Sequence, residues 1–120
     1  AILSTDAHKV IEALPSPGVV HHSASKYWST VNDEGQYYVK GAPSSAYTKA
    51  VSYAKSQIGE PYKLKTSLSN TSEWYCSKLV YKAWQNAGYH VGTLDAYAGA
   101  VLPISIKTDF DTVHYKSNPY

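Results

Sequence analysis

The sequence is poor in several residue types that mark particular classes of protein. Its 120 residues contain one cysteine, one phenylalanine, no methionine and no arginine. A lone cysteine excludes an internal disulfide framework and any metal site built from several cysteines. Without arginine, the chain lacks the fork-shaped donor that most often reads guanine edges or clamps phosphate. We therefore expect no metal, no other cofactor and no nucleic-acid partner.

Long apolar runs are also missing. No stretch approaches the roughly 20 apolar residues that span a bilayer, and no basic segment followed by an apolar run marks a signal peptide. The sequence therefore predicts a single domain over residues 1–120 with no transmembrane segment. Because the chain opens directly in a strand-like run without methionine, we expect that its native N-terminal segment has been removed.

What the sequence has in quantity is tyrosine and lysine. Twelve tyrosines and three tryptophans supply large side chains with a polar tip, which suit a groove for peptide or sugar and equally the surface of a tyrosine-rich exported protein. Eleven lysines, spread along the chain, are offset by nine carboxylates to a net charge of +2. This balance is typical of a solvated surface.

Strand signals occur near both ends of the chain. Residues 1–4 and 9–14 are strand-like and are separated by a polar turn, which predicts a β-hairpin. The run PSPG at residues 15–18 predicts another turn, after which an extended run resumes. Further short strands are expected at residues 36–40 and 112–115.

Helical periodicity occupies the middle. Apolar residues recur at helical spacing over residues 46–58, with Ser44 or Ser45 as the expected cap and Gly59 at the end. A second apolar stripe begins at Cys76 and stops at Gly88. Helices segregated from an antiparallel sheet predict the α+β class.

Cys76 lies in the first turn of the second predicted helix. Unpaired N–H groups and a partial positive charge at a helix start favour the thiolate, which is the nucleophilic form of cysteine. A cysteine on an apolar stripe is also typical of a small buried side chain that only packs. Spacing alone leaves both interpretations open.

The surrounding runs resemble a known family. IGEPY at residues 58–62 and WYCSKLV at residues 74–80 resemble the G-x-P-Y and C-S-x-L-V signatures of NlpC/P60 hydrolases. Upstream, VIEA at 10–13, GVV at 18–20 and KYW at 26–28 resemble the block that carries the superfamily's histidine and third polar residue. Because this block precedes the cysteine, the resemblance is to the circularly permuted, YiiX-like branch, and it covers residues 1 to about 106.

The resemblance implies a papain-like fold with permuted topology, in which an antiparallel sheet packs against helices and the nucleophile begins a helix. It assigns Cys76 as the nucleophile, Glu12 as the polar residue that orients the histidine, and Tyr62 as a residue lining the site and a second oxyanion donor. Tyr75 stands where family members usually place aspartate, so we assign it to the substrate-binding side. From the residues alone, Glu12 is equally an exposed strand residue and Tyr62 a packing residue.

The general base has no clear match. The family's histidine opens the first of the two strands, so the matching position lies at or just ahead of Ala1. We expect the base there, in a removed segment, with His21 or His22 as substitutes. The missing match has a third explanation, namely that the chain is an inactive relative of the family.

The resemblance implies a bacterial cysteine peptidase or amidase that hydrolyses amide bonds through an acyl-enzyme. The favoured substrate is the stem peptide of peptidoglycan, with the protein secreted or associated with the cell envelope. Two alternatives remain open, namely an inactive module on the same fold that binds glycan or peptide, and a lipid acyl amidase or acyltransferase. The expected partner is thus a peptide or acyl-amide substrate.

Overall fold

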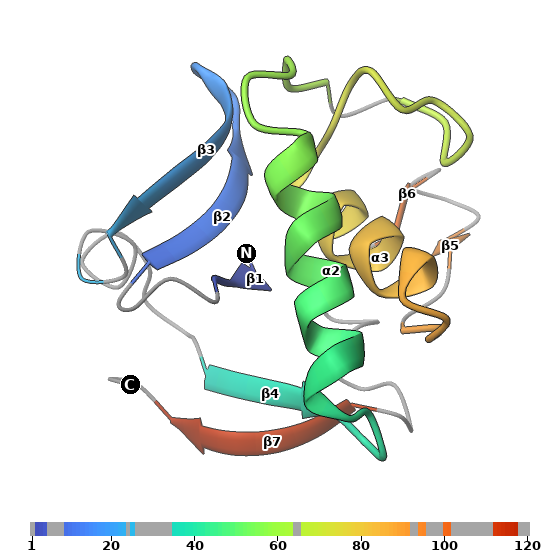
Figure 1. Cartoon of the computed structure of the whole chain (residues 1–120). Coiled ribbons are helices and arrows are strands. Elements are labelled where there is room, and N and C mark those ends of the chain that lie inside the picture. Colours follow the sequence, from blue (N-terminus) through green and yellow to red (C-terminus); the bar gives the residue numbers. More distant parts are fainter. Residues whose placement is uncertain are drawn as a thin grey trace.

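The computed structural model describes residues 2–4, 9–23, 25, 35–63, 66–91, 94–95, 100–101 and 112–117. Along the chain, strands come first, two helices follow, and further strands come last (Figure 1). In chain order they are β1 (Ile2–Leu3), β2 (Lys9–Leu14), β3 (Gly18–Ser23), β4 (Gly35–Val39), α2 (Ser44–Ser56), α3 (Cys76–Asn86), β5 (Leu94–Asp95), β6 (Ala100–Val101) and β7 (Thr112–Ser117). The α+β class is confirmed.

The three N-terminal strands form one antiparallel sheet in the order β1-β2-β3. Ile2 pairs with Ile11, and on the other side of β2 Glu12 pairs with Val20. The predicted hairpin between the first two strands is confirmed, although its turn at residues 5–8 lies outside the described residues. The turn predicted at residues 15–18 is found at residues 15–17, where it joins β2 to β3, and the Ser16–Pro17 peptide bond is cis.

Alternation along β2 divides the sheet into two faces. Ile11 and Ala13 belong to the hydrophobic core together with Val19 of β3, and this core includes buried side chains of both helices. Val10 and Glu12 therefore lie on the opposite face of the sheet. Both are nonetheless buried, since Val10 is 1% exposed and Glu12 8%.

Helix α2 runs through the middle of the molecule and packs against α3 (Figure 1). Its buried stripe of small residues, Ala46, Ala50, Val51 and Ala54, permits this close approach. The predicted serine cap is wrong, because Pro43 occupies the N-cap position and no side chain caps the helix. The Pro43 carbonyl accepts from the amides of Ala46 and Tyr47 at 3.0 and 3.3 Å instead.

The predicted strands near residues 36–40 and 112–115 are confirmed as β4 and β7. They pair with each other in an antiparallel two-stranded sheet, at the foot of α2 in Figure 1. A second such pair joins β5 to β6. Within the described part of the chain, neither helix is long and apolar enough to cross a membrane.

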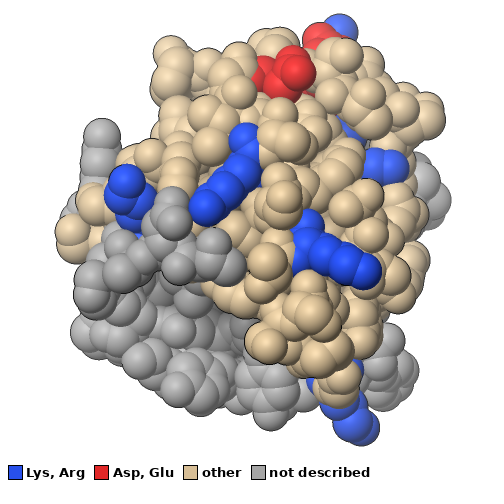
Figure 2. All heavy atoms as spheres, viewed as in Figure 1, with Lys and Arg blue, Asp and Glu red and all other residues tan. Residues whose placement is uncertain are grey.

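On the face shown in Figure 2 the described lysines lie apart from one another, and the acidic residues visible there lie at one edge. The described part of this face therefore shows no contiguous basic track of the kind that follows a phosphate backbone.

Candidate active site

Cys76 is the first residue of α3. The chain enters the helix extended, with Tyr75 at the N-cap position (φ −118°, ψ 165°) and no side-chain cap. The Leu79 amide donates to the Tyr75 carbonyl at 3.1 Å, whereas the amides at the very start of a helix have no partner within it. The Cys76 thiol is free and half-buried, so a reagent can reach it at the start of the helix.

Tyr62 is held beside the chain that enters α3. Tyr62 and Trp74 form a parallel bridge, in which the Trp74 amide donates to the Pro61 carbonyl and the Lys63 amide to the Trp74 carbonyl, each at 3.0 Å. Burial, and in second place the charge of Cys76, raise the pKa of Tyr62. Tyr62 thus lies close enough to Cys76 for a charge on Cys76 to act on its hydroxyl.

Glu12 pairs with His22 rather than with Cys76. The His22 Nε2 atom bonds to Glu12 Oε2, and the other oxygen of this buried carboxylate makes no hydrogen bond to another described residue. The neighbouring His21 points to the other face and bonds through Nε2 to Ser4 Oγ at 2.9 Å. Within the described ranges no hydrogen bond or ion pair connects His22 or Glu12 to Cys76.

A backbone contact fastens the hairpin that carries Glu12 to the segment that carries Tyr62. The Val19 amide donates to the Glu60 carbonyl at 2.9 Å, and the Gly59 amide donates to the Val19 carbonyl at 3.0 Å. Gly18 makes this approach possible, because its φ is +113° and a Cβ atom there would overlap the Glu60 carbonyl oxygen. Sequence reasoning found the GVV and IGEPY runs but missed that they touch.

Tyr75 is the predicted site residue that the structure places least favourably. Its side chain is only 1% exposed, and the preceding Trp74 is fully buried. Contact with a substrate through the Tyr75 ring would require the substrate to reach the interior. Its assignment to substrate binding remains a prediction, as do the roles of the other site residues. The KYW run at residues 26–28 lies outside the described residues.

A half-buried cysteine begins the helix that contacts the antiparallel sheet, and this position suits the cysteine of a papain-like hydrolase. A family model described as "Permuted papain-like amidase enzyme, YaeF/YiiX, C92 family" matches residues 2–107. The chain belongs to this family.

Two similar proteins place the chain further. The uncharacterized protein YiiX of Escherichia coli (strain K12) is 34% identical over 80 residues, which are 62% of this chain and 39% of that protein. The crystal structure of the metalloprotein yiiX from Escherichia coli O157:H7 superposes with a TM-score of 0.76 at 19% identity, over 92% of this chain and 76% of that one. Together, the family model and the second comparison confirm the permuted papain-like fold. The chain spans about two fifths of the length of the first relative.

Proposed function

We propose that this chain is the core of a cysteine amidase with Cys76 as its nucleophile. The observation that carries the proposal is the position of Cys76, half-buried at the uncapped start of α3, where its charge contributes after burial to the raised pKa of Tyr62. Membership of an amidase family supports hydrolysis of an amide bond. The resemblance to NlpC/P60 signatures adds the finer expectation of a cell-wall peptidase.

The chemistry follows from these residues. The Cys76 thiolate attacks the amide carbonyl carbon, forming a C–S bond and an oxyanion that accepts from the Cys76 amide and the Tyr62 hydroxyl. The C–N bond then breaks as the leaving amine takes a proton from the general acid. Water attacks the resulting thioester, giving up a proton to the same group, and releases the acid product and the thiolate.

For the base we retain the position just ahead of Ala1. Ile2 and Leu3 pair with Ile11 and Val10, so a strand continuing before Ala1 would run alongside the end of β2 that leads to Gly18. That is the end of the hairpin bonded to the Tyr62 segment. His22 pairs with Val10, toward the opposite end of β2, which favours a role as partner of Glu12 over a role as the base.

The fold relative from Escherichia coli O157:H7 is called a metalloprotein. In the described residues of this chain, no three His, Cys, Asp or Glu side chains come close enough together to hold a metal ion. Glu12 and His22 supply two such groups and bond to each other. The described residues thus do not fit a metal site, and the proposed reaction has no step through one.

The substrate expectation is the stem peptide of peptidoglycan, which implies a protein at the cell envelope or beyond it. Cys76→Ala and Cys76→Ser in the longest natural form of the chain test the proposal, with purified stem peptides and a long-chain N-acyl amide as parallel substrates. Asn86→Ala, an exposed change on the same helix, is the matched control.

Cleavage of either substrate that is lost in both cysteine variants and kept in Asn86→Ala supports the proposal, and the preferred substrate decides between peptide and lipid amide. Mass spectrometry of the quenched reaction should show an acyl adduct on Cys76. Tight binding of stem peptide without turnover, unchanged in Cys76→Ala, would overturn it in favour of an inactive binding module.

A further inference from the structure

Lys78 is a lysine buried without a carboxylate partner. Its side chain is 0% exposed, although it lies in the first turn of α3, where the helix end already carries partial positive charge. The carboxylate of Glu73 lies 3.9 Å from Lys63 through Oε2. In the described part of the chain no ion pair with Lys78 is formed, so the groups that bond to its ammonium are neutral, and Glu73 acts on it only through its charge at longer range.

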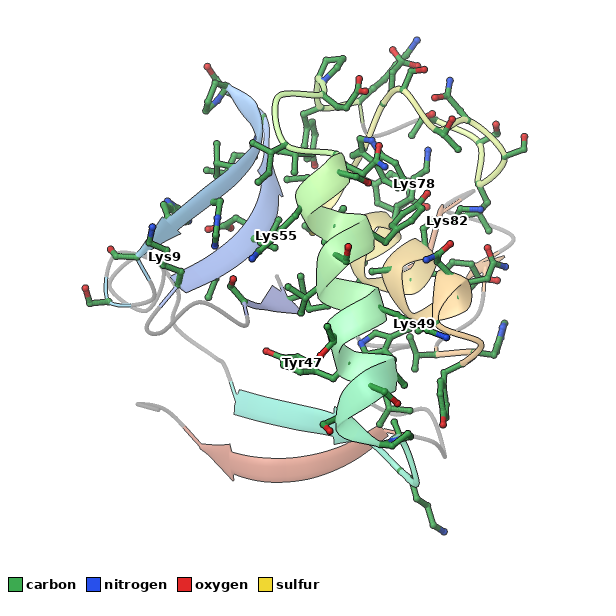
Figure 3. All side chains as sticks on the ribbon, in the orientation of Figure 1. Lys9, Tyr47, Lys49, Lys55, Lys78 and Lys82 are labelled. Carbon is green, nitrogen blue, oxygen red and sulfur yellow. The ribbon has the colours of Figure 1, made fainter. Side chains whose placement is uncertain are left out.

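Those neutral groups all belong to the segment that leads into the helix. The Lys78 Nζ atom donates to the Glu73 carbonyl at 2.7 Å and to Thr66 Oγ1 at 3.3 Å, and it lies 4.8 Å from the centre of the Trp74 ring. Glu73 and Trp74 immediately precede Tyr75 and Cys76. Figure 3 labels Lys78 and Lys82 on α3 below this loop.

The braced segment is also the one that positions Tyr62. Trp74 bonds through its backbone to Pro61 and Lys63 on either side of Tyr62, and its ring packs edge-on against Tyr53 of α2. A shift of Glu73 and Trp74 would therefore move Cys76 and Tyr62 relative to each other. Lys78 is the side chain that ties this junction to the helix.

We infer that Lys78 is a positioning residue, whose amine braces residues 66–75 against α3 and so sets where Cys76 stands relative to Tyr62. The inference deepens the proposed function and rests on it for any effect on turnover. The brace itself is a property of the fold and can be measured without a substrate.

The brace depends on pH. Burial, and then the charge of Lys82, lower the pKa of Lys78 to about 8, and Glu73 opposes this shift. The closed arrangement therefore disfavours the charged form, and opening of residues 66–75 hydrates it. Above about pH 8 the neutral amine still donates to Glu73 while the desolvation cost is gone, so the segment opens less often.

The experiment is amide hydrogen exchange of residues 66–75, corrected for the intrinsic rate, from pH 7 to 9.5. The Trp74 amide, which bonds to Pro61, is the most direct reporter. Wild-type protection should rise through about pH 8. Lys78→Met keeps the apolar stem but removes the donor and the charge. Protection of residues 66–75 in this variant should therefore not change with pH, and at pH 9.5 it should be at least fivefold lower than in wild type.

Lys82→Met is the matched control, because Lys82 is on the same helix but donates to Gln85 at 2.9 Å and makes no hydrogen bond to the described residues of the loop. It should keep a rise, displaced to higher pH because the charge of Lys82 no longer lowers the pKa of Lys78. Exchange in α2 should be unchanged in both variants, which separates a local brace from a general loss of stability. In the active form of the protein, Lys78→Met should lower kcat about tenfold with little change in KM.

Wild-type protection of residues 66–75 that is flat or falls through pH 8 would overturn the inference, and this test needs no variant. The inference would also be overturned if Lys78→Met had the same exchange rates and the same kcat as wild type. If wild type shows the rise but hydrolyses nothing, the brace stands and the proposed function fails.

Discussion

Glu12 on β2 and His22 on β3 bond to each other across the hairpin, on the face of the sheet turned away from the main core. The carboxylate is 8% exposed, and one of its oxygens is occupied by His22. A buried carboxylate needs such a partner, because an unpaired one carries the full cost of desolvation. Among the described residues, the second oxygen of Glu12 makes no hydrogen bond, and under the proposed function it would orient the general base.

Removing His22 should therefore destabilise the fold through Glu12. We expect His22→Ala to lower the free energy of unfolding by about 1–3 kcal/mol in urea denaturation, since a buried acceptor loses its donor. Glu12→Gln combined with His22→Ala should cost less than the sum of the single changes. His90→Ala, at an exposed position after α3, serves as control. Additive costs would show that the two side chains do not interact in solution.

Gly18 should be the least replaceable glycine in the described part of the chain. Gly18→Ala places a methyl group against the Glu60 carbonyl, with Pro61 Cα only 3.2 Å away, and it also strains a backbone with φ of +113°. Gly88→Ala has a similar φ of +93° but open space around the new atom. We expect about 1 kcal/mol for Gly88→Ala and at least about 2 kcal/mol for Gly18→Ala. Equal losses would contradict a tight contact between β3 and residues 59–61.

The sequence predicted the elements of this fold better than their contacts. The cores of α2, α3 and β2 follow from periodicity, because apolar spacing depends on residues close together in the chain. The bond between Val19 and Glu60, the bridge between Tyr62 and Trp74, and the pairing of β4 with β7 depend on how distant segments pack. No local pattern encodes them.

In the candidate site too, features set by nearby residues could be predicted, and contacts between distant segments could not. Cys76 at the start of a helix could be predicted, because Gly88 and the apolar stripe fix the helix and its register. The pairing of Glu12 with His22 could not, because it depends on the strand register that places Val10 opposite His22. Lys78 gave no signal at all, since a lysine two positions after Cys76 is expected to reach solvent.

Tyr62 should report the charge of Cys76. A thiolate near the phenol disfavours a second negative charge, so Cys76→Ala should lower the pKa of Tyr62, while burial keeps it above the ordinary value. The change is measured by absorbance titration at tyrosinate wavelengths. In wild type and in Cys76→Ala alike, the curve of the protein that also carries Tyr62→Phe is subtracted, which leaves the titration of Tyr62. Tyr53, whose pKa is raised by burial alone, is the control and should not respond. An unchanged Tyr62 titration would place the two side chains too far apart for the proposed oxyanion site.

Lys78 gives the whole fold a distinct pH dependence. Its pKa is lowered to about 8 in the folded chain and returns to 10.5 on unfolding, so between these values the unfolded state binds more protons. The free energy of unfolding must then rise with pH in this window. We expect the stability of wild type relative to Lys78→Met to increase from pH 7 to pH 10 by on the order of 1 kcal/mol. This is less than the free energy equivalent to the whole pKa shift, because solvent on the side of Lys82 and Glu73 screens the charge.

Urea denaturation of wild type, Lys78→Met and Lys82→Met at pH 7, 8, 9 and 10 measures this difference, and groups common to all three proteins cancel. The free energy of unfolding of Lys82→Met should rise with pH as steeply as that of wild type or less steeply. Removing Lys82 relieves part of the repulsion that lowers the pKa of Lys78. A wild-type advantage that shrinks with rising pH would mean that the ammonium gains a charged partner on folding. That sign would remove the physical basis for the brace between Lys78 and the segment that leads into Cys76.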